Sequence, residues 1–305
     1  MKHNTLRTIA ATVVIAGLLA CSDSTKVNSQ TPQGAGTSQQ VNYLTYICSL
    51  KLPSTLTFCG EKVPLDIPEV RERAEREFYV NIQSPGQLIL NYKRLSRYFP
   101  LFSSILKQEG VPDDLKYISL AESALYMAKS PKDAVGLWQF MEGTAKRYGL
   151  RVDDDVDERK HVEKSTRAAI AYLKKSYAKF GSWTLAAASY NQGYEGTVDD
   201  VDFQRTTSFY DMFLNDETSR YIFRIVVLKE LMEHAASYGM SINQSELYPA
   251  YQSSTVTVAD AIPDLSAWAL DHGTTYKEVK TLNPWIRRRA LPKPKSGSWE
   301  IAVPK

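Results

Sequence analysis

The sequence predicts a mainly α-helical chain that ends in a small module of mixed helices and strands. Apolar residues recur at helical spacing through most of residues 68–238, and no stretch there alternates as a strand would. After Ser253 the pattern changes to strand, helix, helix and strand. A chain of 305 residues, 43% of them hydrophobic, is long enough for one sizeable core and one smaller module. The net charge of +3 is too slight to indicate a nucleic-acid partner.

Residues 1–40 have the composition of an export signal followed by a tether. Lys2 and Arg7 precede an apolar run, residues 9–20, that is too short to span a bilayer and typical of a signal peptide. The run closes with Leu18-Leu19-Ala20-Cys21, which resembles the lipobox of bacterial lipoproteins. The resemblance implies cleavage after residue 20 and a diacylglyceryl anchor on Cys21; the alternative is ordinary secretion with an incidental cysteine. Residues 21–40 are rich in Ser, Thr, Gln and Gly, which predicts a flexible tether.

Helices are predicted from proline and capping signals as well as from periodicity. Pro68–Val80 alternates acids and bases on a solvated face. Ser84 and Pro85 provide an N-cap and a first-turn proline for a helix through Tyr98, and Pro100 is expected to begin another. Further helices are expected after Pro112 as far as Leu125, and over Ser165–Phe180, Trp183–Tyr190 and Glu217–Tyr238.

Glu122 is the polar residue that most needs an explanation. It falls on the apolar stripe of its predicted helix, together with Ile118 and Leu125. Carboxylates are almost never buried without a partner, because removing the charge from water is costly. Glu122 either reaches from the edge of the stripe to solvent or to an arginine, or it acts as a general acid with a raised pKa.

The segment Gly136–Phe140 favours the general acid, because it adds a large aromatic ring and an amide after a glycine turn. An acid, an aromatic platform and an amide are the groups that a carbohydrate cleft needs. Two later stretches offer further polar groups at helix ends: Ala187–Gly193 ends a helix of small residues, and Glu217–Tyr221 opens the last long helix.

Cys48 and Cys59 remain once Cys21 is assigned to the anchor. In an exported chain we expect them to form a disulfide across a short loop; the alternative is two free or separately buried thiols. Neither is expected to be a nucleophile, because no basic pattern nearby would lower the thiol pKa.

Neither a metal site nor a cofactor is predicted. The acidic run Asp153–Glu158 lacks the spacing of a calcium loop, because Glu158 and Lys164 stand where an EF-hand needs Gly and Glu. We expect this run to be a solvated loop. The four His residues show no metal-ligand spacing.

Four motifs in order resemble the lytic murein transglycosylases that have a soluble-lytic-transglycosylase, lysozyme-like domain, and most of all their membrane-bound type D branch. The motifs are Glu122-Ser123, Gly136-Leu137-Trp138-Gln139, Ser189-Tyr190-Asn191 and Glu217-Thr218-Ser219-Arg220-Tyr221. One departure is Leu125, where the family often has an aromatic residue. The resemblance implies an all-α catalytic domain over residues 41–250, with a helical arm at its N-terminal side.

The resemblance also implies a role for each matching residue. Glu122 would be the single catalytic acid and base, and Ser123 would orient it or contact substrate. Gln139, Tyr190 and Asn191 would contact the sugar and its N-acetyl group. Tyr221 would lie near the catalytic carboxyl, and Trp138 would stack on the sugar or form a wall of the cleft.

The reaction implied is cleavage of the MurNAc-β-1,4-GlcNAc bond of peptidoglycan with formation of a 1,6-anhydro-MurNAc end. Two alternatives remain open: a muramidase of the same fold, which would leave reducing ends, and a non-catalytic peptidoglycan-binding lipoprotein. An acid on an apolar stripe argues against the second alternative, since a binding module does not need one. Glycan strands and the membrane are the partners expected, no nucleic acid is expected, and no protein partner is indicated.

Residues 251–305 resemble a degenerate LysM module, a small α+β unit that binds peptidoglycan. Leu282-Asn283-Pro284 and Ile301–Pro304 carry the resemblance, whereas Ile262–Leu265 replaces the usual Gly-Asp-Thr-Leu entry. Arg287-Arg288-Arg289 would face either an anionic polymer or, more commonly for a charge run, only solvent. With Ser22 after the anchor, the lipoprotein resemblance implies the periplasmic face of the outer membrane as its location.

Overall fold

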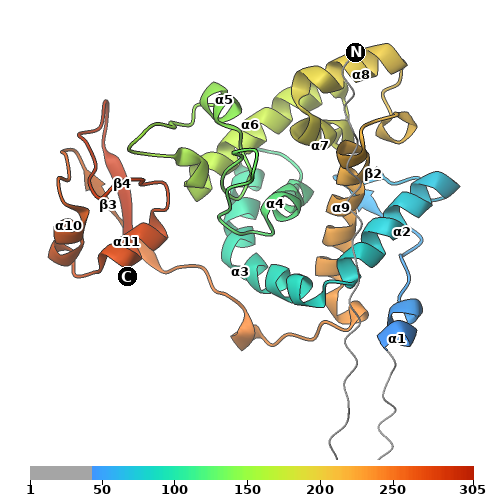
Figure 1. The fold of residues 1–305 in the computed structure, drawn as a ribbon, viewed down its shortest axis with the longest axis horizontal. Helices are drawn as coiled ribbons and strands as arrows, with labels where there is room; N and C mark the ends of the chain where they lie inside the picture. The colour runs from blue at the N-terminus through green and yellow to red at the C-terminus, as the bar shows by residue number, and fades with distance from the viewer. Residues whose placement is uncertain (1–42) are drawn as a thin grey trace, which may run out of the picture. The chain divides into compact units, whose positions relative to one another are not determined.

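The computed structural model describes residues 43–305 and has a helical body followed by a small mixed module (Figure 1). This is the predicted fold class. Outside the described residues lie Cys21, the signal peptide and the tether. None of the helices within 43–305 is both long and apolar enough to cross a membrane. The helices of the body are α1 Tyr43–Ser49, α2 Pro68–Ile82, α3 Pro85–Gln108, α4 Lys116–Ser123, α5 Glu142–Arg147, α6 Val162–Phe180, α7 Trp183–Gln192, α8 Tyr194–Gln204 and α9 Asp216–Glu233.

Helix α9 is the central element of the body. It packs against α2, α4 and α7, and its buried residues occur on almost every side of the helix, as expected for a core helix. Figure 1 shows α2, α4 and α7 gathered around it. The end of α4 and the start of α9 are thereby brought together, although they are far apart in the sequence.

Helix α3 runs through Pro100 without a break, so the prediction of a separate helix from Pro100 was wrong. A proline inside a helix removes one backbone hydrogen bond and crowds the preceding turn. Here Leu88 before the proline and Phe102 and Ile105 after it are all buried in the same core. Packing of both halves against one core therefore outweighs the local cost.

A small hairpin before the helices caps one of them. Strands β1 (Thr57–Phe58) and β2 (Glu61–Lys62) pair antiparallel. The Glu61 carboxylate accepts hydrogen bonds from the backbone N–H groups of Trp183 and Thr184 and from the Ser182 hydroxyl. The negative charge thus satisfies free N–H groups at the start of α7, where the helix dipole favours it.

The prediction of a disulfide was wrong: Cys48 and Cys59 are both free thiols. Cys48 is exposed on α1, whereas Cys59 packs against the core in the turn between β1 and β2. Burial raises the pKa of the Cys59 thiol, and the neighbouring Asp114 raises it further. A thiol with a raised pKa is rarely ionised near neutral pH, so Cys59 is expected to be unreactive.

The C-terminal module has the predicted order of strand, helix, helix and strand. Its elements are β3 Ser253–Val258, α10 Leu265–Asp271, α11 Tyr276–Leu282 and β4 Trp299–Pro304. The two strands pair antiparallel, with Ser253 opposite Pro304 and Val258 opposite Trp299. A second hydrophobic core, separate from that of the helical body, lies beneath this sheet.

Two charge runs that were expected to face solvent also contact each other, although Arg288 and Asp154 stay largely exposed. Arg288 contacts the carboxylate of Asp154 at 3.0 Å and that of Asp155 at 3.3 Å. The backbone N–H of Arg287 donates to the carbonyl of Asp155 at 2.8 Å. Between these contacts Val156 is fully buried in the core of the module. The acidic loop, residues 153–158, therefore forms the interface between the module and the helical body.

Candidate active site

Glu122 lies in the last turn of α4, and the chain turns sharply after it. Ala124 and Leu125 both adopt left-handed backbone conformations, with φ of 51° and 54°. Such conformations are uncommon for residues with a side chain, and they persist only where the surroundings enforce them. Arg94 on α3 donates to the carbonyl of Ala124 at 3.0 Å, and the Leu125 side chain is buried. The end of the helix that carries Glu122 is therefore held in place from two sides.

The Glu122 side chain is half-buried and hydrogen-bonded to α9. The hydroxyl of Tyr221 donates to its Oε1 atom at 2.5 Å. Burial raises the pKa of Glu122 from 4.5 to about 7, while the hydrogen bond from Tyr221 and the positive charge of Arg224 oppose the rise. Glu217 adds a smaller upward contribution. Glu122 can thus hold a proton near neutral pH and also lose it, which is what general acid–base catalysis requires.

Replacing Tyr221 by Phe should raise the pKa of Glu122, because the hydrogen bond that stabilises the carboxylate is lost. In a profile of kcat/KM against pH, the fall in rate on the alkaline side should move to higher pH. The matched control is Tyr238→Phe, which removes a similar bond, from Tyr238 to Glu230 at 2.8 Å, away from Glu122. An alkaline limb at the wild-type position in Tyr221→Phe would contradict the assigned contact.

The motif Gly136–Gln139 forms a tight loop against α4. Gly136 has φ of 88°, and a Cβ atom there would lie 2.1 Å from the carbonyl oxygen of Arg159, so only glycine fits. The hydroxyls of Ser119 and Ser123, one turn apart on α4, donate to the carbonyl of Leu137 at 2.9 and 2.8 Å. The Ser123 donor is thus used within the protein, where it holds the loop against α4.

Arg159 holds the same loop from its other side. Its guanidinium donates to the carbonyls of Asp133 and Phe140 at 3.1 and 3.2 Å. A buried ion pair with Asp157, at 2.8 Å, keeps the guanidinium in place. A buried arginine of this kind needs such partners, because its charge cannot be given up. The loop that carries the motif Gly136–Gln139 is therefore fixed on both sides by hydrogen bonds to its backbone.

Trp138 does not face a cleft, so its expected role as a sugar platform was wrong. The side chain is fully buried, packs on Phe102 at 5.4 Å between ring centroids, and donates from Nε1 to Thr166 at 2.9 Å. Its backbone does contribute to the site, since its carbonyl accepts from the hydroxyl of Tyr190 at 2.8 Å. The ring fills the core beneath the loop, and the sequence pattern alone could not distinguish that position from a cleft wall.

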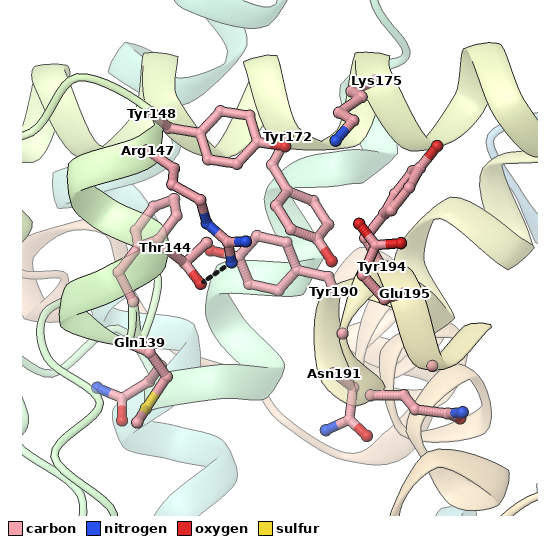
Figure 2. A pocket seen from close by; sticks show the side chains of 15 residues that line it. Gln139, Thr144, Arg147, Tyr148, Tyr172, Lys175, Tyr190, Asn191, Tyr194 and Glu195 are labelled. Carbon is pink, nitrogen blue, oxygen red and sulfur yellow. Dashed lines mark hydrogen bonds between the residues drawn. The ribbon is translucent and has the colours of Figure 1, made fainter. Parts of the chain in front are cut away.

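Gln139, Tyr190 and Asn191 line a cavity of about 750 Å³ (Figure 2). Figure 2 shows Gln139 and Asn191 on opposite sides of the cavity, with Tyr190 between them. The Gln139 amide nitrogen donates to the carbonyl of Gly136 at 2.7 Å, and the Asn191 amide oxygen accepts from the hydroxyl of Thr218 at 2.9 Å. Both amides are thus oriented before any ligand enters.

Tyr190 lines the cavity and also interacts electrostatically with the Glu122 carboxyl. Burial raises the pKa of its hydroxyl well above the usual value, and the charge of Glu122 adds to the rise. The ring packs edge-on against Phe140 and Tyr172. Gln139, Tyr190 and Asn191 thus line the cavity, while Glu122 and Tyr221 are not part of its lining but interact electrostatically with Tyr190.

Sequence reasoning missed several polar groups that line this cavity, namely Thr144, Arg147, Lys175 and Glu195. They lie on α5, α6 and α8, where periodicity assigns polar residues to a solvated face. Figure 2 shows that Arg147 and Thr144 lie on the same side of the cavity, joined by a hydrogen bond of 3.2 Å. No motif marks these residues, because only the packing of the helices turns their faces toward the cavity.

A family model of the transglycosylase SLT domain matches residues 100–212. Those residues are a transglycosylase SLT domain. A second model, the LysM-like domain found at the C-terminus of soluble lytic transglycosylases, matches residues 254–305, so the module is LysM-like as expected. The SLT match ends before α9, so the contact between Tyr221 and Glu122 lies partly outside it.

Two named relatives extend the comparison. The chain is 26% identical to membrane-bound lytic murein transglycosylase D of Escherichia coli K12, over 81% of this chain and 55% of that protein. It is 38% identical to the peptidoglycan transglycosylase gp16 of Escherichia phage T7 over 102 residues, which are 32% of this chain and 8% of that protein. The chain thus spans about half the length of the E. coli relative.

Proposed function

We propose that this protein is a peptidoglycan lytic transglycosylase that cleaves the MurNAc-β-1,4-GlcNAc bond and leaves 1,6-anhydro-MurNAc ends. The observation that carries the proposal is the Glu122 carboxyl, half-buried beside the cavity, with a pKa of about 7 and a hydrogen bond from Tyr221. The SLT domain and the names of its two relatives point to the same substrate.

In the proposed reaction, protonated Glu122 donates its proton to the glycosidic oxygen as the bond to the muramyl C1 breaks. The carbonyl of the substrate N-acetyl group stabilises the positive charge that develops at C1. The Glu122 carboxylate then takes the proton of the C6 hydroxyl, whose oxygen forms the new bond to C1. No water enters the product. A pKa near 7 suits both steps, since one residue must give and then accept a proton.

The surroundings of the other candidate carboxylates support a mechanism with one acid. Glu142 pairs with Lys146 at 2.6 Å, and Glu217 pairs with Arg224 at 3.0 Å; both carboxylate side chains are more than half exposed. Most glycosidases instead place two carboxylates on either side of the scissile bond. Of Glu122, Glu142 and Glu217, Glu122 alone is half-buried, so in this mechanism the substrate's own groups supply the second function.

Gln139 and Asn191 are proposed to hold the N-acetyl group, with Tyr190 beneath the sugar. Their pre-oriented amides offer both a donor and an acceptor across the cavity. A substrate group held in a near-attack geometry reacts with an effective molarity of up to about 10⁵–10⁸ M. If the amides fix the sugar by its N-acetyl group, the C6 hydroxyl of the same sugar is also fixed near C1, and it would react there faster than bulk water.

The proposal is tested by the ends of the products. Digested peptidoglycan sacculi, analysed by mass spectrometry, should yield muropeptides with 1,6-anhydro ends, each one water lighter than the hydrolysed form. Asn191→Ala should slow the reaction without changing the kind of end. A digest dominated by reducing muramic ends would instead identify a muramidase.

We further propose that the protein is a lipoprotein held by Cys21 at the periplasmic face of the outer membrane. The lipobox-like sequence before Cys21 supports the anchor, and the membrane-bound relative supports attachment to a membrane. Cys21→Ala should abolish incorporation of a labelled fatty acid and release the chain from the membrane fraction. Labelled lipid on the Cys21→Ala chain would disprove the assignment.

A further inference from the structure

A second cavity, of about 380 Å³, lies where the helical body, the linker and the LysM-like module meet. Helix α3, the segment after Glu122, the linker before β3 and the end of α11 each form part of its wall. The arginines and tyrosines in its lining are Arg94, Arg97, Tyr98, Tyr126, Tyr248 and Tyr251. None of the four motifs includes any of these residues.

Two guanidinium groups are built into this cavity. Arg94 donates to the carbonyl of Ala124 at 3.0 Å and lies 5.6 Å from the ring centre of Tyr126. Arg97 donates to the carbonyl of Pro249 at 3.2 Å and lies 4.5 Å from the ring centre of Tyr251. Each arginine is thus oriented, while a guanidinium has five N–H donors in all.

Neither arginine is neutralised by an acid within the described residues. Glu246, the one acid of linker residues 239–252, pairs with Lys93 at 3.7 Å, and neither Arg94 nor Arg97 forms a salt bridge within residues 43–305. Oriented guanidinium groups with free donors bind carboxylates in a two-pronged geometry. The exposed ring of Tyr126 adds a flat apolar surface beside them.

The cavity adjoins the proposed catalytic site through one short segment. Tyr126 and Met127, in its wall, follow Glu122 by four and five residues. The next residue, Ala128, accepts a hydrogen bond from the Gln139 amide at 3.4 Å, and Gln139 lines the first cavity. Residues 122–128 thus connect Glu122 along the chain to the walls of both cavities.

The linker and the module are held in place at this cavity. The linker is bound to α3 by the backbone N–H of Tyr248, which donates to Lys93 at 3.0 Å, and by the Ser96 hydroxyl, which donates to Tyr248 at 2.7 Å. The contact between Arg288 and Asp154 and the burial of Val156 join the module to the body. The module thus contributes to a wall of the cavity.

We infer that this cavity binds a carboxylate-bearing part of the glycan strand that is being cleaved. The inference rests on the proposed function, because it takes the strand to be peptidoglycan. Such strands carry carboxylates on the muramyl lactyl group and on the stem peptides, whereas a chitin-like strand carries none. Two guanidinium groups without an ion-pair partner would strengthen the binding of an anionic strand and would not strengthen that of a neutral one.

The test measures binding to the full chain carrying Glu122→Gln, so that the probes are not cleaved. The probes are a GlcNAc–MurNAc tetrasaccharide with stem peptides, the same sugar without peptides, and a neutral GlcNAc tetramer. Adding Arg94→Gln or Arg97→Gln should weaken binding of the peptide-bearing probe by about tenfold or more, the usual effect of losing a charge-assisted hydrogen bond. Binding of the neutral tetramer should not change.

The two anionic probes identify the carboxylate. An equal loss of affinity for both probes would assign the bound carboxylate to the lactyl group. A loss of affinity confined to the peptide-bearing probe would assign it to the stem peptide. Arg289→Gln, the same change of charge at an exposed site of the module, should have no effect. If a variant does not fold, added salt should still weaken binding of the anionic probes to the Glu122→Gln chain more than binding of the neutral one.

Unchanged affinity in both arginine variants, or an equal loss for the neutral tetramer, would overturn the inference. Failure of the proposed function gives a different result. In that case the chain with Glu122 intact would release no muropeptides, whatever the arginine variants bind.

Discussion

Replacing Glu122 by Gln is expected to abolish turnover while leaving the fold intact. The amide is nearly the same size as the acid but cannot donate a proton to the glycosidic oxygen or accept one from the C6 hydroxyl. Positioned acid–base groups contribute about 10²–10⁴-fold to a rate, and here one residue serves both steps, so we expect a loss of at least that size. Release of soluble muropeptides from sacculi measures it.

The same variant tests the burial of the carboxyl through its stability. In the wild type, a folded-state pKa of about 7 against an ordinary value of 4.5 means that ionisation favours the unfolded chain as pH rises between these values. A shift of that size corresponds to about 3 kcal/mol. The difference in free energy of unfolding between Glu122→Gln and the wild type should therefore grow, in favour of Glu122→Gln, as pH rises from about 4.5 to 7. Above about pH 7 this difference should stay constant.

Denaturant titrations of both proteins across this pH range provide the measurement. A difference that does not vary with pH would show that the Glu122 carboxyl is solvated and that its proposed role as the acid is wrong. A wild-type rate of muropeptide release from Glu122→Gln would exclude that role directly.

Replacing Gly136 by Ala should destabilise the protein by about 2–5 kcal/mol, because two costs add together. The added Cβ atom would lie 2.1 Å from the carbonyl oxygen of Arg159, and the backbone φ of 88° disfavours any side chain. The obstacle is backbone, which cannot swing aside as a flexible side chain would. Activity should fall as well, because Leu137 and Gln139 belong to the same loop.

Gly143→Ala is the matched control. Gly143 lies in helix α5 with ordinary helical φ and with nothing within 4 Å of an added Cβ atom. Alanine is there expected to leave stability unchanged or to raise it slightly, because it favours the helix. Equal stability of Gly136→Ala and the wild type in denaturant titration would contradict the tight packing of the loop on Arg159.

Local signals in the sequence were sufficient to place most helices. Gly181 ends α6 in a left-handed conformation, and the Ser182 side chain caps α7 by accepting from the backbone of Leu185, both at their predicted positions. These signals work because capping bonds form within a few residues of each other. The position of Glu122 on an apolar stripe was readable for a similar reason, since helical periodicity alone determines which face a residue occupies.

Tertiary structure decided what the sequence pattern left open. Trp138 lies in the core instead of the cleft because α3 and α6 supply Phe102 and Thr166 around its ring. The two charge runs contact each other because folding brings Arg288 to Asp154, which lies 134 residues before it in the sequence. The pKa of Glu122 depends on burial and on Tyr221, 99 residues away. Each of these is a contact between distant segments, whose free energy no local pattern records.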